Sequence, residues 1–97
     1  MKEQIIKAIE NRNLLQFYYD ENLRIVEPHT FGFSKKGNDI LSAYQIDGKS
    51  DKGYVPDWKL FTISKILTLK TLERTFEGER EGYNTDDSRM ITIYAEL

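Results

Sequence analysis

The spacing of apolar residues changes once near the start of the chain, from a helical period to a period of two. Ile5, Ala8 and Ile9 lie at helical spacing within residues 2–11, with charged side chains between them. This pattern predicts a short amphipathic helix, which must dock on a core because so short a helix is marginal alone. From residue 14 onward apolar and polar residues alternate, which is typical of strands with one buried face.

Strand-like runs separated by polar breaks continue as far as residue 72. Pro28 is expected to end one of them, because proline has no amide hydrogen to donate to a neighbouring strand. Residues 47–57, which are polar and contain glycine and proline, are expected to form the longest loop within the strand region. A two-residue corner at residues 64–65 is expected to return the chain beside the preceding strand. Five or six short strands are expected, at residues 14–19, 23–27, 31–33, 40–46, 58–63 and 66–72.

The end of the chain carries two competing patterns. Four apolar residues fall at helical spacing, namely Met90, Ile93, Tyr94 and Leu97. Residues 85–87 are able to cap such a helix, so a helix is the preferred prediction. The β-branched residues of the same segment, 91–94, are typical of a strand, and that alternative stays open.

One helix followed by short strands with tight connections predicts a mainly β fold with a flanking helix. At this size, closing the sheet into a barrel removes its exposed edges. We therefore expect an SH3-like (Sm-like) small β-barrel with an N-terminal helix and a short C-terminal element. A single domain over residues 1–97 is expected, with the helix in 1–13, the barrel in 14–76 and a tail in 77–97. The expected barrel core is Leu15, Phe17, Ile25, Leu41, Ala43, Phe61, Ile63 and Leu69.

Composition narrows the class of protein. The chain has 97 residues, of which 39% are hydrophobic, and it contains no cysteine. The apolar content is too high for a disordered chain, and the absence of cysteine excludes disulfides and thiolate metal sites. The apolar stretches are too short for a transmembrane helix, and the first residues lack the apolar core of a signal peptide. A cytoplasmic protein without a membrane partner is expected.

Charge is unevenly distributed along the chain. The formal net charge is −2, which argues against a surface coated in basic side chains for duplex binding. Residues 35–70 carry seven Lys and four Asp, a net charge of +3, whereas residues 71–97 carry three Arg and seven acidic residues, a net charge of −4. Ordinary solvated surface explains this pattern, and a basic binding site on the central part is the sharper alternative.

The residues needed for common catalytic chemistry are missing. The glycines form no phosphate-binding loop, and His29 has no neighbour at metal-ligand spacing. Glu27 lies near His29, but we expect Glu27 to end a strand and His29 to lie on the surface after the proline. The adjacent pair Asp86-Asp87 is expected to act as a cap or as solvated surface. The sequence therefore predicts no enzyme, no cofactor and no metal.

Aromatic and basic side chains alternate in the central part of the chain. Aromatic faces stack on bases or other flat ligands, and lysine ammonium groups pair with phosphate. The alternative for Trp58 is that it caps the end of the barrel, and its indole N–H then needs a partner. The candidate ligand-binding residues are Arg24, Lys59 and Lys65 for charge, Tyr44 and Trp58 for stacking, and His29 for a hydrogen bond.

The order of several short blocks over about residues 5–76 resembles the WYL-domain family. After the helix, the matching blocks are Leu15-Gln16-Phe17-Tyr18-Tyr19, Arg24-Ile25-Val26-Glu27-Pro28-His29, Leu41-Ser42-Ala43-Tyr44 and Lys59-Leu60-Phe61-Thr62-Ile63-Ser64-Lys65-Ile66. The family's Trp-Tyr-Leu tripeptide reads Asp39-Ile40-Leu41 in this chain. The family's last block reads roughly Arg-x-Phe-Arg-Leu-Asp-Arg-Ile, so lysines stand at two of its arginines. Lysine keeps the charge but lacks the bidentate fork, which weakens any anion site that the resemblance implies.

The resemblance implies a fold and a function. WYL domains have an SH3-like barrel and usually follow a DNA-binding domain in bacterial transcription regulators, where they sense a ligand, often a nucleic acid or nucleotide. We therefore expect a non-enzymatic ligand-sensing module whose partner is a single-stranded nucleic acid or a nucleotide. The alternative is a protein–protein interaction module that uses a barrel edge or the acidic C-terminal tail.

Overall fold

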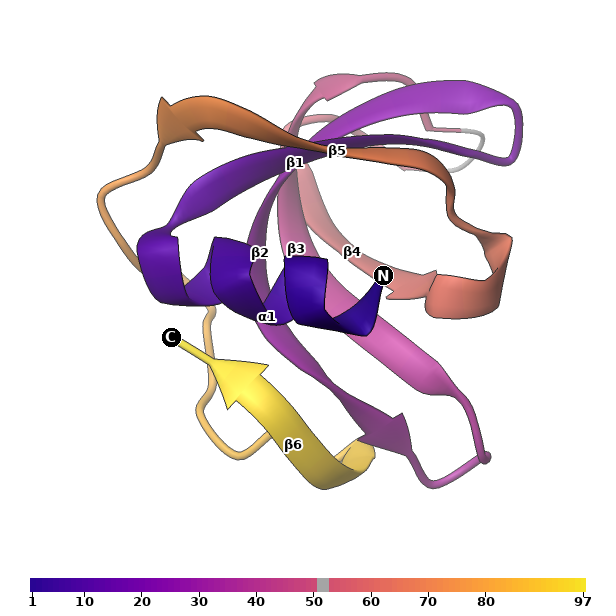
Figure 1. Cartoon of the computed structure of the whole chain (residues 1–97), viewed down its shortest axis with the longest axis vertical. Helices are drawn as coiled ribbons and strands as arrows, with labels where there is room; N and C mark the ends of the chain where they lie inside the picture. The colour runs from indigo at the N-terminus through magenta and orange to yellow at the C-terminus, as the bar shows by residue number, and fades with distance from the viewer. Residues whose placement is uncertain (51–52) are drawn as a thin grey trace.

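The computed structural model describes residues 1–50 and 53–97, and it shows a mainly β protein with one N-terminal helix (Figure 1). The elements are α1 (Lys2–Asn11), β1 (Asn13–Tyr19), β2 (Asn22–Ser34), β3 (Asp39–Gly48), β4 (Asp57–Thr62), a 3-10 helix (Ile63–Lys65), β5 (Leu67–Thr75) and β6 (Met90–Glu96). The pairings are antiparallel in the strand order β4-β3-β2-β1-β5, and β6 pairs with β2. No helix of the described residues is long and apolar enough to cross a membrane.

The N-terminal helix forms as the sequence predicts. Ile5, Ala8 and Ile9 are buried, and α1 packs on β1, β2, β5 and β6 (Figure 1). The helix ends at Arg12, which adopts the left-handed conformation (φ 56°) and donates its backbone N–H to the carbonyl oxygens of Ala8 and Ile9. The apolar stripe of the helix therefore becomes part of the same core that the sheet encloses.

The strand β2 runs straight through Pro28, so the expectation that Pro28 ends a strand is wrong. A register shift between Pro28 and Thr30 marks a bulge against β3, where a residue without an amide hydrogen is tolerated. On its other side β2 has two successive neighbours. β1 pairs with residues 22–26 and β6 pairs with residues 30–34, which leaves 27–29 between them.

The C-terminal element is a strand and not the helix that the apolar spacing favours. β6 pairs with residues 30–34 of β2, which would otherwise present an open edge on that side. The close approach requires glycine at position 32, since a Cβ atom there would lie 2.3 Å from the carbonyl oxygen of Thr92. The β-branched run therefore decides the conformation, because a partner strand is available to it.

The last two strands of the predicted barrel are not neighbours in the sheet. β5 pairs with β1 and not with β4, so the corner at residues 64–65 does not return the chain beside β4. The corner is the 3-10 helix, which carries the chain from one end of the strand order to the other. The hydroxyl of Tyr19 accepts a 3.1 Å hydrogen bond from the backbone N–H of Thr62 and links the end of β1 to the end of β4. Within the described residues β4 and β5 do not pair, so hydrogen bonds do not close the sheet.

The core follows the predicted alternation except in β2. Leu15 and Phe17 stand opposite Val26 and Arg24, so these two β2 residues face inward and Ile25 is only partly buried. Leu69 likewise packs against the core without being fully buried. The buried apolar cluster is Ile5, Ala8, Ile9, Leu15, Phe17, Val26, Phe31, Leu41, Ala43, Phe61, Ile63 and Ile66.

Candidate functional site

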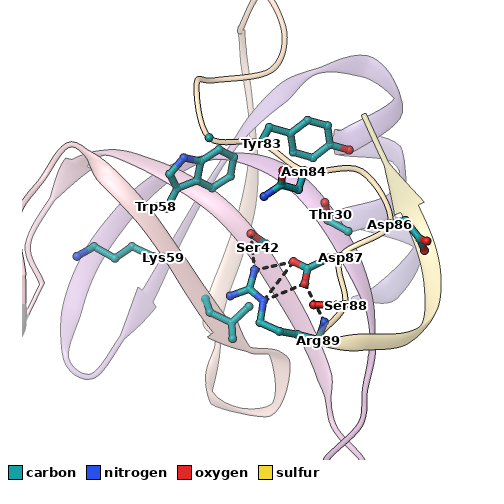
Figure 2. Close-up of a pocket in the computed structure, with 12 residues that line it drawn as sticks. Thr30, Ser42, Trp58, Lys59, Tyr83, Asn84, Asp86, Asp87, Ser88 and Arg89 are labelled. Carbon is teal, nitrogen blue, oxygen red and sulfur yellow. Dashed lines mark hydrogen bonds and ion pairs between the residues drawn. The ribbon is translucent and has the colours of Figure 1, made fainter.

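A pocket of about 460 Å³ lies between the sheet and the β5–β6 connection, residues 76–89 (Figure 2). One side of this sheet–loop pocket comes from β2, β3 and β4, and the other from residues 82–89 of the connection. The residues that line it are Thr30, Ser42, Trp58, Lys59, Leu60, Gly82, Tyr83, Asn84, Asp86, Asp87, Ser88 and Arg89.

Trp58 forms the aromatic wall of the sheet–loop pocket. Its indole N–H donates a 2.9 Å hydrogen bond to the carbonyl oxygen of Glu81. Its ring meets His29 edge-on at 4.6 Å and lies nearly parallel to Tyr83, with 6.4 Å between the ring centroids. Gly82 allows this approach, because a Cβ atom there would lie 3.0 Å from the indole nitrogen and the residue has φ +92°. The orientation of the indole is thereby fixed by its neighbours.

Arg89 supplies a positioned cation to the same pocket. Its guanidinium group donates to both carboxylate oxygens of Asp87, with a shortest distance of 2.6 Å, and Nη2 also donates to Oγ of Ser42 at 3.4 Å (Figure 2). Hydrogen bonds from Arg89 hold the pKa of Asp87 below its usual value, and the same carboxylate raises the pKa of Arg89. Within the part of the chain that the structure describes, these bonds use Nε and Nη2, which leaves Nη1 for another acceptor. An oriented guanidinium recognises carboxylate or phosphate well.

His29 lies behind Trp58 and is fully buried, so the expectation of a surface histidine is wrong. Its Nδ1 lies 2.8 Å from the carbonyl oxygen of Glu27, and its Nε2 accepts a 3.1 Å hydrogen bond from the backbone N–H of Arg80. Burial lowers the pKa of His29 below its usual value. The imidazole is thus neutral and fully engaged inside the protein, and it does not line the pocket.

Glu27 is also buried and pairs with Arg80, and it lies within β2 instead of ending a strand. The guanidinium of Arg80 donates to both carboxylate oxygens at 2.6 and 2.9 Å, and it covers the ring of Tyr44 at 4.8 Å. The Glu27 carboxylate raises the pKa of Arg80 above its usual value. Tyr44 therefore lies beneath an arginine and edge-on to Trp58, outside the pocket lining.

The side chain of Arg24 is held inside the fold by hydrogen bonds. It is buried, it donates from Nε and Nη2 to the carbonyl oxygen of Tyr19, and it donates from Nη1 to Oε1 of Gln45. It borders a smaller pocket of about 260 Å³ together with Lys59 and Phe61. Arg24 is not among the residues that line the sheet–loop pocket with Trp58.

The structure therefore brings together only part of the predicted set. Trp58 and Lys59 line the sheet–loop pocket, with His29 and Tyr44 behind the indole. Lys65 lies in the 3-10 helix, away from this pocket. The residues that sequence reasoning missed are Ser42, Tyr83, Asn84, Asp87 and Arg89. The only local signal for them is the short Asp87–Arg89 spacing, because the connection meets the sheet through the fold alone.

Among the described residues, no group of three or more His, Asp or Glu side chains is placed to hold a metal ion. No family model, curated protein or solved structure matches the chain in sequence or fold comparisons.

Proposed function

We propose that the protein is a non-enzymatic binding module whose ligand is a small, flat anion, such as a nucleotide or the end of a single-stranded nucleic acid. The observation that carries this proposal is the presence of Trp58 and Arg89 in one pocket, with the guanidinium oriented by Asp87 and Ser42. Trp58 offers a surface for a flat ring, and Arg89 offers its remaining N–H groups to an anionic group. Lys59 adds a second cation to the same lining.

The size of the pocket supports a ligand of this class. A volume of about 460 Å³ lies within the range of small-molecule sites, which is roughly 300–1,000 Å³. Stacking of one base on an aromatic side chain contributes about 1–3 kcal/mol. A single base with its phosphate would therefore bind with modest affinity, and the affinity would fall as salt rises.

The topology supports an SH3-like barrel as the scaffold of this module. The strand order β4-β3-β2-β1-β5 puts β4 and β5 at its two ends, and only four residues, the 3-10 helix and Ile66, join those ends. We propose that β4 and β5 complete a small barrel at this corner and that the chain is a divergent WYL-like sensing module of a regulatory protein. The ordered blocks of the sequence support the second part of this proposal.

Fluorescence titration tests the proposed function, because Trp58 is the only tryptophan and lines the pocket. We expect adenosine and guanosine monophosphates and short oligonucleotides to change Trp58 emission at low salt. For the oligonucleotides, the slope of log affinity against log salt is expected to be about −0.7 per phosphate contact. Arg89→Ala should weaken binding at least tenfold, since it removes the cation and leaves the Asp87 carboxylate facing the ligand.

Arg74→Ala is the matched control, because Arg74 lies on β5 outside the sheet–loop pocket. Equal affinity of the parent protein and the Arg89→Ala variant would contradict the proposed site. An absence of binding by the parent protein at low salt would leave the protein–protein alternative, for which the acidic β5–β6 connection and the outer edge of β4 are the candidate surfaces.

A further inference from the structure

His29 joins the β5–β6 connection to the sheet. Its ring stacks on Phe76 at 5.6 Å with 22° between the planes, and it contacts Tyr83 at 5.4 Å. Its Nε2 accepts the backbone N–H of Arg80 from the same connection. Residues from three places in the connection therefore rest on one buried imidazole.

These contacts require one protonation state. Nδ1 faces the carbonyl oxygen of Glu27 at 2.8 Å, and a carbonyl only accepts, so Nδ1 carries the hydrogen. Nε2 faces the backbone N–H of Arg80 at 3.1 Å, and an N–H only donates, so Nε2 presents its lone pair. A proton added at Nε2 would place two donors against each other, and the connection would have to move away.

Burial outweighs the charged groups around His29 that favour the imidazolium, so the protonated form is disfavoured in the closed structure. Glu27 on its own strand and Glu79 on the connection favour the protonated form, and Arg80 opposes it. Both oxygens of Glu27 are already bonded to the guanidinium of Arg80. The connection also presents the phenol of Tyr83, and β4 presents only the uncharged indole of Trp58. Burial is the largest influence, and it lowers the pKa of His29.

We propose that His29 is a proton-operated latch, so that its protonation releases residues 76–89 from the sheet and opens the sheet–loop pocket. Trp58 and Tyr83 contact the imidazole and also line the pocket, so the latch and the pocket share their walls. The consequence for a ligand rests on the proposed function, whereas the opening itself does not. A ligand held between the sheet and the connection would be released as the pH falls.

The direction of the effect follows from proton linkage. The open form exposes an imidazole with an ordinary pKa of about 6.5, and the closed form has a lower pKa. The neutral imidazole therefore makes its full contribution to the stability of the closed form above about pH 6.5. Below that value the ratio of open to closed molecules rises about tenfold per pH unit, until the pKa of the closed form is reached.

Amide hydrogen exchange of Arg80 between pH 7.5 and 5 tests the latch. After correction for intrinsic exchange rates, we expect its protection to fall about tenfold per pH unit below pH 6.5. The amide of Phe17 in the buried β1 strand should keep its protection and serves as the internal control. Protection of Arg80 that does not depend on pH in the parent protein would overturn the proposal, whether or not any variant folds.

Two variants separate His29 from its acidic neighbour. His29→Gln places an amide oxygen where Nε2 accepts and takes up no proton in this pH range, so the protection of Arg80 should become independent of pH. Glu27→Gln keeps the imidazole, so the pH dependence should persist. A pH dependence that survives in His29→Gln, or disappears only in Glu27→Gln, would assign the effect to another group and overturn the latch.

Titration with adenosine monophosphate at pH 7.5 and 5.5 distinguishes the latch from the proposed function. Opening of the connection without nucleotide binding at either pH would support the latch and count against the proposed ligand. Binding at pH 7.5 together with pH-independent protection of Arg80 would support the ligand and overturn the latch. Binding that weakens at least fivefold at pH 5.5 in the parent protein, but not in His29→Gln, would support both.

Discussion

Replacement of Phe61 by alanine tests how the sheet encloses its core. Phe61 lies on β4, is 1% exposed, and meets Phe17 edge-on at 4.9 Å and Tyr19 edge-on at 5.0 Å. The guanidinium of Arg24 also lies 5.8 Å from the centre of its ring. Phe61→Ala therefore removes the ring that joins β4 to β1 across the core and leaves a void that this tightly paired sheet cannot easily fill.

The expected loss of stability follows from burial and from the two aromatic contacts. Deletion of a fully buried phenylalanine side chain costs about 3–5 kcal/mol, which includes the cavity it leaves. Each edge-to-face aromatic pair contributes about 0.5–1.5 kcal/mol beyond its buried area, so the upper half of that range is expected for Phe61. A domain of this size has a total free energy of unfolding of about 5–15 kcal/mol, so the variant should lose a large part of it.

Urea unfolding followed by far-ultraviolet circular dichroism measures this loss. With a slope of about 1–3 kcal/mol per molar urea, the midpoint should fall by roughly 1–5 M. Leu60→Ala is the matched control, since Leu60 is the neighbouring residue of β4 and is 43% exposed. Its midpoint should change by no more than about a quarter of the Phe61→Ala shift. Coincident midpoints for Phe61→Ala and the parent protein would refute the placement of Phe61 in the core.

Two further predictions concern the ion pairs of the β5–β6 connection. Arg80→Ala leaves the Glu27 carboxylate, whose side chain is 4% exposed, without its partner; we expect a loss of about 1–3 kcal/mol in urea unfolding, and recovery of that loss in the double variant with Glu27→Gln. A loss that persists in the double variant would show that Arg80 stabilises the protein through the packing of the β5–β6 connection on the sheet, and not through its ion pair with Glu27. The Asp87 carboxylate has a pKa lowered from 3.8 by Arg89, so its stabilisation is present above about pH 4 and is lost as the pH falls through the lower folded value. Asp87→Asn should therefore reduce the fall of the urea midpoint between pH 5 and pH 3, and an unchanged acid profile would show that the pair contributes nothing.

The sequence predicts the elements whose patterns are local. A helix is predicted by the spacing of Ile5, Ala8 and Ile9, and a strand by the alternation of Leu15 and Phe17. Neither prediction depends on distant residues, and both are confirmed. The strands that become β3 and β4 are predicted for the same reason. The elements that were predicted wrongly depend on distant partners.

Pro28 and the C-terminal element illustrate this limit. A proline in a strand is tolerated only where the ladder shifts, and the shift between Pro28 and Thr30 depends on the pairing with β3. The choice between helix and strand at residues 90–96 is decided by residues 30–34, which lie about sixty positions earlier in the chain. Local spacing carries no information about either partner.

The candidate site is harder to predict than the fold. Trp58 and Lys59 are found by residue type, because an aromatic residue beside a basic one is a recognisable binding pattern. His29 is buried by Phe76, Arg80 and Tyr83, which follow it in the sequence by about fifty residues. The residues next to His29 in the sequence therefore do not indicate that it is buried. The guanidinium of Arg89 meets Ser42 only because the connection crosses the sheet.

The two successive neighbours on one side of β2 also determine the order in which the sheet is completed during synthesis. β1 precedes β2 and β3 follows it directly, so these partners are available early. The remaining side of residues 30–34 gains its partner only when residues 90–96 have been made. Until then a nascent chain presents an open strand edge that contains Phe31 and Phe33, and such an edge is a template for pairing with other chains. Formation of β6 thus removes an aggregation-prone edge that the chain exposes until residues 90–96 are made, in addition to completing the folded sheet.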